Sequence, residues 1–270
     1  MIHLSKKVNF QGRKLIYDNA ACRKGKGTHF ALRRTKHFLS EYHKKHGSAG
    51  YILKCDIRKF FDSIDHTILK QKWRKVIPDE AVQSLLEMLI DSYEKQPGKG
   101  LPLGNQTSQW FALYYLDQLD RFVKERMQIR YYSRYMDDCI LIHPDKEYLK
   151  KCLVGMQHLL KEHLKLEFNE KTQICPVRNG VDYLGVHFYL SETGKVILKV
   201  RQQTKYKYKR KLKKMQREYS EETMTLRDIK QVLASYHAHL GFGHTYQLRK
   251  RAMAEFVLNK VERNGKQIWQ

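Results

Sequence analysis

The stretch Ile129-Arg-Tyr-Tyr-Ser-Arg-Tyr-Met-Asp-Asp-Cys-Ile-Leu-Ile-His143 contains two short β-forming runs that meet at a pair of adjacent aspartates. Aromatic and β-branched residues favour strands, so this pattern predicts a hairpin with Asp137 and Asp138 at its tip. An isolated Asp-Asp pair is commonly a surface turn, but here the chain becomes apolar directly after the two charges. Adjacent carboxylates raise each other's pKa unless a cation neutralises them. We therefore expect a divalent metal near this tip.

A third carboxylate follows another apolar run. Residues 51–55 have the pattern of a buried strand, which delivers Asp56 at its end. Carboxylate oxygens select Mg²⁺ or Mn²⁺ over Zn²⁺, and two such ions about 3.5 to 4 Å apart can activate a 3′-hydroxyl and stabilise a leaving pyrophosphate. Nearby, Asp65 is expected to cap a helix that begins near His66, and Asp62 to be a solvated turn residue. Neither is assigned a catalytic role.

The rest of the chain alternates between helical and strand patterns, as in an α+β protein. Helices are expected over residues 29–46, 80–93, 105–124 and 146–163, and strands over 164–168, 172–176 and 183–189. Beyond about Val200 the chain becomes basic and helical, with helices expected over 202–217, 225–240 and 244–261. The predicted domains are a catalytic body over residues 1–200 and a helical domain over residues 201–270.

Charge indicates a polyanionic partner. The 270 residues include 52 Lys and Arg against 28 Asp and Glu, a formal charge of +24, far above the magnitude of about 2 to 8 usual for a small soluble domain. The basic run over residues 202–217, with Tyr206 and Tyr208 interleaved, suits a nucleic-acid duplex, although a solvated linker helix is an alternative. The glycine-rich basic loop over residues 17–28 precedes a helix and could hold phosphates, or be a solvated turn.

Other features bear on the compartment and on metals. Five widely spaced cysteines argue against disulfides and zinc ribbons, and for a reducing cytosol. No apolar run reaches the ~18 residues of a membrane span, and Met1 opens no signal-peptide pattern, so a cytoplasmic protein is expected. Three histidines within residues 237–244 could suggest a metal cluster, but a helix ending at Gly241 and Gly243 explains them better.

These segments resemble the reverse transcriptase family. Tyr135-Met-Asp-Asp138 is similar to its catalytic hairpin, and Asp56-Ile-Arg-Lys-Phe-Phe61 to its first metal motif. The resemblance implies a right-hand polymerase fold: fingers and palm, with an antiparallel sheet packed on helices, and a small C-terminal three-helix thumb. It also implies that two Mg²⁺ ions, with Mn²⁺ as a substitute, are held by Asp56, the Ile57 backbone carbonyl, Asp137 and Asp138.

Further motifs extend the resemblance over nearly the whole chain. The loop from Arg23 to Thr28 is similar to the segment that grips the incoming triphosphate, and residues 101–109 resemble the nucleotide-pocket motif. The implied nucleotide-binding residues are Arg23, Lys26, Phe61, Leu103, Gly104 and Gln109. Phe61 would lie under the sugar and collide with a 2′-hydroxyl, so that DNA is made, whereas Phe60 would be core. Residues 166–172 nominate Lys171 to protonate pyrophosphate, and the implied primer grip is Tyr183, Leu184 and Gly185.

The nucleotide-pocket motif also bears on the subclass. The family usually has Gln before the glycine and Ser-Pro at the end, whereas here Leu103 precedes Gly104 and Gln109 follows Ser108. This form, together with Asn19 to His29, resembles the enzymes of diversity-generating retroelements of bacteria or phages. Those enzymes copy a template RNA mutagenically, chiefly at adenines. The resemblance implies a template RNA, an RNA/DNA hybrid, dNTPs and a small, basic, oligomeric accessory protein as partners.

Three alternatives remain open at this stage. A group II intron, retron or defence-associated bacterial reverse transcriptase would share the three aspartates. A non-enzymatic RNA-binding or splicing factor would have no need of them. A two-metal nuclease would use clustered aspartates but would need neither an aromatic gate at Phe61 nor a primer grip.

Overall fold

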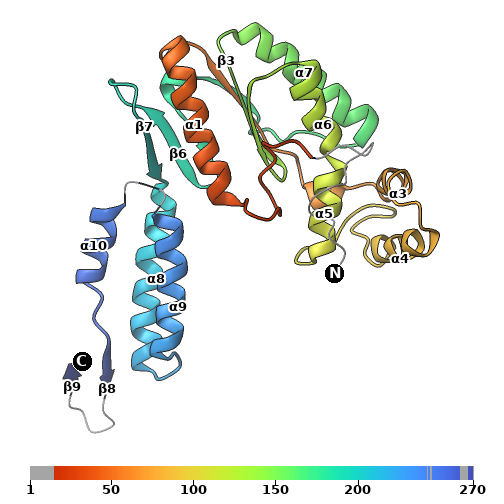
Figure 1. The fold of residues 1–270 in the computed structure, drawn as a ribbon. Coiled ribbons are helices and arrows are strands. Elements are labelled where there is room, and N and C mark those ends of the chain that lie inside the picture. Colours follow the sequence, from red (N-terminus) through yellow and green to blue (C-terminus); the bar gives the residue numbers. More distant parts are fainter. Residues whose placement is uncertain (1–14, 242, 244, 262–266, 270) are drawn as a thin grey trace. The chain divides into compact units, whose positions relative to one another are not determined.

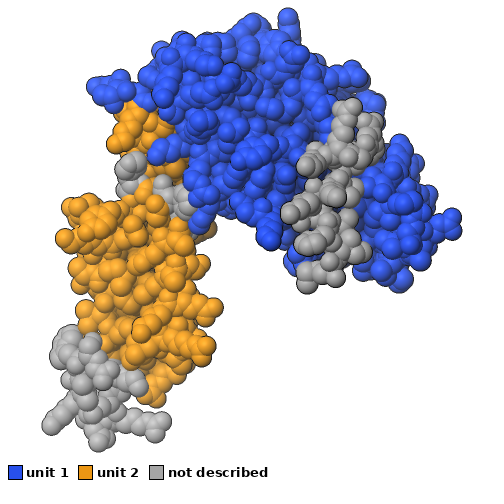
Figure 2. Space-filling model, in the orientation of Figure 1, with its two compact units in different colours: residues 1–181, 192–194 blue, residues 182–191, 195–270 orange. Residues whose placement is uncertain are grey.

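A computed structural model describes residues 15–241, 243, 245–261 and 267–269. Two compact units are present (Figure 2): the first contains residues 1–181 and 192–194, and the second contains residues 182–191 and 195–270. This division by contacts falls near Asp182, because the strands within residues 182–191 and 195–200 belong with the C-terminal helices. The predicted boundary between a catalytic body and a helical domain at residue 201 stays a prediction. Among the described residues, no helix is long and apolar enough to span a bilayer.

The first unit is α+β (Figure 1). Its elements are α1 (Thr28–His46), β1 (Tyr51–Cys55), α2 (Phe60–Ser63), α3 (His66–Arg74), α4 (Glu80–Asp91), α5 (Gln106–Tyr115), α6 (Asp117–Arg121), the π-helical turn Phe122–Arg126, β2 (Tyr131–Tyr135), β3 (Asp138–His143), α7 (Lys146–Leu164), β4 (Gln173–Pro176) and the 3₁₀ turn Val177–Asn179. The predicted hairpin is therefore β2 and β3, and the predicted strand before Asp56 is β1.

An antiparallel four-stranded sheet of order β2-β3-β1-β4 forms the centre of this unit. Every residue from Cys139 to Ile142 of β3 is buried, as are neighbouring residues Ile52 and Leu53 of β1. Successive side chains on a strand point to opposite faces, so both faces of the sheet are covered. Helix α7 packs on β1 and β3, and α1 contacts β2.

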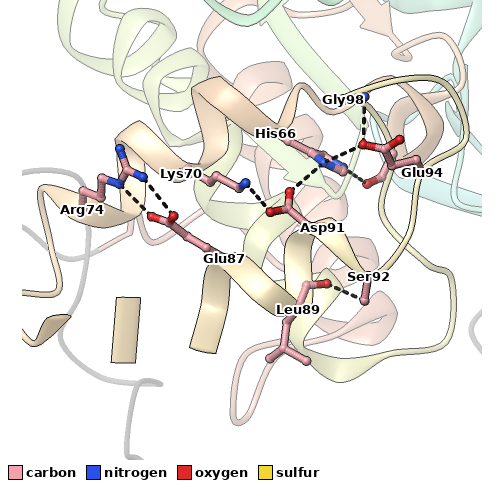
Figure 3. Close-up of polar contacts among 10 residues, drawn as sticks. His66, Lys70, Arg74, Glu87, Leu89, Asp91, Ser92, Glu94 and Gly98 are labelled. Carbon is pink, nitrogen blue, oxygen red and sulfur yellow. Dashed lines mark hydrogen bonds and ion pairs between the residues drawn. The ribbon is translucent and has the colours of Figure 1, made fainter. Parts of the chain in front are cut away.

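Beside this core, helices α3 and α4 are joined by ion pairs and hydrogen bonds between their side chains (Figure 3). Asp65 caps α3 as predicted, since its carboxylate accepts from the Ile68 N–H at 3.0 Å. His66 is 3% exposed, with Nε2 2.7 Å from the Gly100 carbonyl and Nδ1 3.5 Å from Asp91 Oδ1. The backbone of residues 98–101 also bonds to that of residues 61–66. The loop that leads into the nucleotide-pocket motif is therefore tied to the segment after Asp56.

The second unit contains β5 (Val181–Tyr183) from Asp182 onward, β6 (Val186–Leu190), β7 (Val196–Val200), α8 (Gln202–Ser220), α9 (Leu226–Leu240), α10 (Tyr246–Ala254), β8 (Asn259–Val261) and β9 (Gln267–Trp269). Helix α8 buries Tyr208, Leu212, Met215 and Tyr219, which recur every three or four residues and so form one face. Helix α9 ends at Leu240, with Gly241 as its C-cap. His237 bonds to the Tyr208 hydroxyl at 2.9 Å, whereas the His239 side chain and His244 lie outside the described residues.

Several predicted elements were wrong. The helix expected over 105–124 breaks at Leu116, where the chain turns so that α6 directs Asp117 and Asp120 inward. The strand expected over 164–168 is only a single bridge from Phe168 to Ile57, because α7 continues to Leu164 and Lys165 then adopts φ +49.

Three further differences concern ends and turns. The strand expected over 183–189 is interrupted at Leu184 and Gly185, which both have positive φ, as in a tight hairpin turn. The last helix ends at Ala254, and the chain continues into β8 rather than remaining helical to residue 261. Asp62 lies within the short helix α2 and not in a turn.

Candidate active site

The register of the sheet brings two of the predicted aspartates together. Strands β1 and β3 are antiparallel, with Cys55 opposite Cys139. The residue after Cys55 therefore lies opposite the residue before Cys139, which places Asp56 beside Asp138 at one end of the two central strands. Asp137 precedes Asp138 in the hairpin turn. All three are half-buried, so their carboxylates are within reach of solvent and of a substrate.

The hairpin tip has an unusual backbone. Tyr135 pairs with Asp138, which leaves Met136 and Asp137 as a two-residue turn. Met136 has φ +53, a left-handed conformation that costs a non-glycine residue about 1 to 2 kcal/mol. The Arg134 guanidinium donates to the Met136 carbonyl at 2.6 Å. A side chain from the strand thus holds the turn in the conformation that presents Asp137.

Arg134 is itself part of a fully buried ion pair. Its Nε and Nη2 donate to the two carboxylate oxygens of Asp120, each at 2.6 Å, and both side chains are 0% exposed. Asp120 also accepts from the Tyr132 hydroxyl at 2.7 Å and from the Asn19 amide at 3.2 Å. This group of four side chains, here called the Asp120 network, joins α6, β2 and the segment before α1.

The backbone adds to this connection. Ala20 N–H donates to the Arg134 carbonyl at 2.9 Å, and Arg134 N–H donates to the Asp18 carbonyl at 3.1 Å. Asp18 in turn accepts from Arg34 Nε at 2.6 Å. The segment over residues 18–20 therefore lies along β2 as an additional short edge of the sheet.

Electrostatics at the tip disfavour negative charge. Burial raises the pKa of the Asp137 carboxyl above its ordinary value, and the charge of Asp56 raises it further, against the lowering effects of a backbone hydrogen bond and of Arg134. Lys54 Nζ lies 3.9 Å from Asp138 Oδ2. A cation between Asp56 and Asp137 would relieve their repulsion.

The carboxylate of Asp56 is oriented by Asn169. The Asn169 amide donates to Asp56 Oδ2, and its backbone N–H donates to the Asp56 carbonyl at 2.8 Å. A second bond runs from Arg58 N–H to the Glu167 carbonyl at 2.9 Å. These two bonds flank the bridge between Ile57 and Phe168 and leave the Ile57 carbonyl out of it. The resemblance to reverse transcriptases implied that this carbonyl is a metal ligand, and the two hydrogen bonds of the bridge do not involve it.

The donors at this end of the central strands suit a hard divalent cation. They are carboxylates and a backbone carbonyl, the ligands that Mg²⁺ and Mn²⁺ prefer. In the part of the chain that the structure describes, no three His, Cys, Asp or Glu side chains are already arranged as a metal site. The fit therefore depends on donor chemistry and on the raised pKa of Asp137.

In the basic loop before α1, the side chains of Arg23 and Lys26 bond to nearby backbone carbonyls of the same segment. Arg23 Nη1 donates to the carbonyls of Ile16 and Asn19 at 2.6 and 3.1 Å. Lys26 donates to the Tyr17 carbonyl and lies over the Tyr17 ring, 4.1 Å from its centroid. Burial lowers the pKa of Lys26 to about 8. Triphosphate binding by Arg23 and Lys26 stays a prediction, and it requires these contacts to be exchanged for phosphate.

The nucleotide-pocket motif lies at the start of α5. Leu103 is 76% exposed, unusually high for a large apolar side chain, and Gly104 has φ +91, which favours glycine. Gln109, in the second turn of α5, accepts from the Cys22 thiol at 2.8 Å. After Asp56, Phe60 is 2% exposed, as expected of a core residue, whereas Phe61 is half-buried with its ring edge-on to that of Phe60.

Lys171 and the predicted primer grip lie on other segments of the chain. Lys171 is exposed on the turn after Asn169, and its backbone N–H donates to Asn169 Oδ1 at 2.9 Å. Tyr183 is fully buried, and Leu184 and Gly185 form the turn between β5 and β6. Tyr183 to Gly185 belong to the second unit, so their role as a primer grip stays a prediction.

Comparison with known proteins decides the family. Residues 3–188 match the family described as reverse transcriptase (RNA-dependent DNA polymerase), and this range includes all three aspartates. The chain belongs to the reverse transcriptase family. The expectation of an RNA-directed DNA polymerase, a nucleotidyl-transferring enzyme, is confirmed at the level of the family.

Individual proteins are similar to this reverse transcriptase chain in part of its sequence or in its fold. A stretch of 95 residues, 35% of the chain, is 30% identical to the Gag-Pro-Pol polyprotein of mouse mammary tumor virus (strain BR6) and covers 5% of that protein. Telomerases from Candida tropicalis and Candida albicans, each solved with a fragment of telomeric RNA, align over 85% of the chain with TM-scores of 0.52 and 0.50. Sequence identities are 14% and 11%, so these two structures support the polymerase fold alone.

The reverse transcriptase chain spans 43% of the length of either telomerase. Sequence reasoning had missed the residues that hold its hairpin, chiefly Arg134 and Asp120. A signal was present: Arg134 interrupts a strand of tyrosines, and Asp117 and Asp120 closely follow the apolar run over residues 110–116. Charges at apolar positions indicate buried pairing, but sequence alone does not say which charge meets which.

The Asp120 network predicts a specific pattern of stability. Arg134→Met leaves the Asp120 carboxylate buried and unpaired, so we expect a loss of about 3 to 5 kcal/mol in the free energy of unfolding. Arg134→Met combined with Asp120→Leu should recover much of that stability, because no buried charge is left unpaired. Polymerase activity of the double variant should stay low, since the Met136 carbonyl has lost its donor. Urea unfolding and primer extension measure the two effects.

The matched control is Arg130→Met, which breaks an ion pair with Glu41 on the surface. Its stability should change by less than about 1 kcal/mol. A double variant that is as active as the wild type would show that Arg134 does not orient the hairpin.

Proposed function

We propose that this chain is the error-prone RNA-directed DNA polymerase of a diversity-generating retroelement, acting by two-metal-ion nucleotidyl transfer. The observation that supports the polymerase site is the register of β1 and β3, in which Asp56 lies beside Asp138 while the turn presents Asp137. The feature that supports the subclass is the nucleotide-pocket motif, in which an exposed Leu103 replaces the usual Gln.

Asp56, Asp137, Asp138 and the Ile57 carbonyl would hold the ions. Two Mg²⁺ ions, or Mn²⁺ in their place, would supply activation of the primer 3′-hydroxyl and neutralisation of the pyrophosphate. Asn169 orients the Asp56 carboxylate, and Arg134 holds the turn that presents Asp137. Phe61 would exclude a 2′-hydroxyl from the sugar site, Arg23 and Lys26 would contact the triphosphate, and Lys171 would donate a proton to pyrophosphate.

The mutagenic character is assigned to Leu103. An amide at this position could hydrogen-bond within the nascent base pair, whereas an apolar side chain cannot. Losing a polar contact that only a correct pair satisfies weakens the rejection of mispairs. Substrates would be a template RNA, the growing RNA/DNA hybrid and dNTPs. A small, basic, oligomeric accessory protein is the proposed protein partner, and the enzyme would act in the cytoplasm of a bacterium or with a phage genome.

The second unit is proposed as the thumb. Helix α8 buries one face and exposes Arg210, Lys213 and Arg217 on another, at the three- and four-residue spacing that aligns side chains along a helix. Together with Lys214, they line a shallow groove of about 400 Å³. A row of cations on a helix suits a phosphate backbone. A group II intron or retron reverse transcriptase would share this feature, so it supports duplex binding and not the subclass.

Asp137 supplies the first test. Asp137→Asn should lower polymerase activity by about a thousandfold or more, because several kcal/mol of metal-dependent stabilisation are lost. The pKa of Asp137 is raised, so its charged form destabilises the fold at neutral pH, and the neutral Asn should increase thermal stability in EDTA. Mg²⁺ should raise the melting temperature of the wild type more than that of the variant. Asp62→Asn is the control for removing a carboxylate near the site. An active Asp137→Asn enzyme would contradict the proposed site.

Leu103 supplies the second test. Leu103→Gln should lower misincorporation opposite template adenines, by about fivefold for the ~1 kcal/mol contribution of one hydrogen bond. Sequencing of cDNA made on an adenine-containing RNA template measures it. Leu85→Gln is the matched control, since Leu85 is 52% exposed and lies on α4. An unchanged adenine error rate would remove Leu103 as the cause.

Helix α8 supplies the third test. Lys213→Gln should weaken binding to an RNA/DNA hybrid regardless of sequence and reduce the slope of log K against log salt by about 1. Lys150→Gln on α7, which removes a lysine that pairs with Glu147, should leave that slope unchanged. Equal slopes for wild type and Lys213→Gln would exclude α8 from the duplex interface.

A further inference from the structure

A thiol and an amide 87 residues apart are joined by a hydrogen bond in the first unit. The Cys22 Sγ donates to Gln109 Oε1 at 2.8 Å, and both residues are half-buried. Cys22 lies in the turn before α1, whereas Gln109 lies on α5 within the nucleotide-pocket motif. Neither the metal site nor the hairpin tip accounts for this contact.

The position of the thiol is set by its surroundings. Cys22 has φ +47, a conformation that a non-glycine residue adopts only where neighbouring contacts hold it. Two residues earlier, Ala20 N–H bonds to the Arg134 carbonyl at 2.9 Å, and on the other side Arg23 bonds to the carbonyls of Ile16 and Asn19. The thiol is therefore fixed relative to the strand that carries the catalytic turn.

The direction of the bond follows from the chemistry of the two groups. Burial raises the pKa of the Cys22 thiol, so the sulfur keeps its proton and acts as the donor. A glutamine amide has an acceptor oxygen on one side and an NH₂ donor on the other, whereas a thiol sulfur is a weak acceptor. The oxygen of Gln109 is therefore favoured toward Cys22, and its NH₂ group faces away from the sulfur.

We propose that Cys22 is a positioning residue that holds the Gln109 amide with its NH₂ group toward the nascent base pair. There the NH₂ group would donate to an acceptor on the minor-groove edge, where purines and pyrimidines both present acceptor atoms. This inference rests on the proposed function, in which Gln109 lines the nucleotide pocket. Cys22 does not touch the nucleotide, and it acts through Gln109 alone.

Fixing the amide in advance should affect nucleotide binding more than the chemical step. A Gln109 free to rotate would present its oxygen part of the time and would repel an acceptor atom. Cys22→Ala removes the donor, so the KM for dNTP should rise about fivefold, equivalent to about 1 kcal/mol, while kcat stays within about twofold. Cys22→Ser keeps a donor at the same place and should restore most of the affinity.

The experiment is single-nucleotide primer extension on an RNA template with Mg²⁺, using the full chain. It compares wild type, Cys22→Ala, Cys22→Ser, Gln109→Ala and the double variant Cys22→Ala with Gln109→Ala. Cys175→Ala is the matched control, because Cys175 is also half-buried and its thiol lies near the carbonyls of Ile52 and Gly180. Its KM should equal that of the wild type. The double variant should be no worse than Gln109→Ala, since Cys22 has no other route to the nucleotide.

The outcomes distinguish a failure of this inference from a failure of the proposed function. Extension by the wild type, with the KM of Cys22→Ala raised and that of Cys22→Ser restored, supports the inference. An unchanged KM in Cys22→Ala, a Cys22→Ser enzyme as impaired as Cys22→Ala, or additive effects in the double variant would overturn the inference and leave the polymerase assignment standing. A wild-type chain that extends no primer overturns the proposed function, and this inference with it.

Discussion

The buried ion pair between Arg134 and Asp120 is the interaction on which the rest of the site depends. Two charges taken out of water cost several kcal/mol each, which only good geometry and further hydrogen bonds offset. Here both Asp120 oxygens are used, by Arg134, Tyr132 and Asn19, and the remaining Arg134 nitrogen holds the Met136 carbonyl. One guanidinium therefore connects α6 to the turn between β2 and β3.

This connection explains how a strained turn persists next to repelling carboxylates. Met136 in a left-handed conformation and Asp137 with a raised pKa are both unfavourable alone. Arg134 holds the turn and lowers the pKa of Asp137, while Asn169 holds the neighbouring Asp56 carboxylate. Strain of this type is commonly stored at active sites, where a rigid surrounding structure maintains it.

In the proposed site, the residues assigned to the reaction and those assigned to selectivity lie on different elements. The carboxylates follow β1 or lie in the β2–β3 hairpin, at the ends of the central strands, where register leaves them little freedom. Leu103 and Gln109 lie at the start of α5, next to a loop that is held by backbone bonds and by His66. Under this proposal, reverse transcriptases of different biology would share the first group and differ in the second, so family membership alone does not decide the subclass.

The sequence by itself determined the hairpin with Asp137 and Asp138 at its tip, the strand before Asp56, the cap at Asp65 and the extents of α1 and α7, to within one residue for the helices. The spacing of apolar residues along the chain and the capping chemistry of neighbouring residues specify these features without reference to distant residues. Tertiary structure decided the break at Leu116, the pairing of Arg134 with Asp120, and the contact between Cys22 and Gln109. Each joins residues far apart in the chain, or, at Leu116, follows from such a pairing. A buried charge or a half-buried amide finds its partner through the packing of whole elements, which no local pattern records.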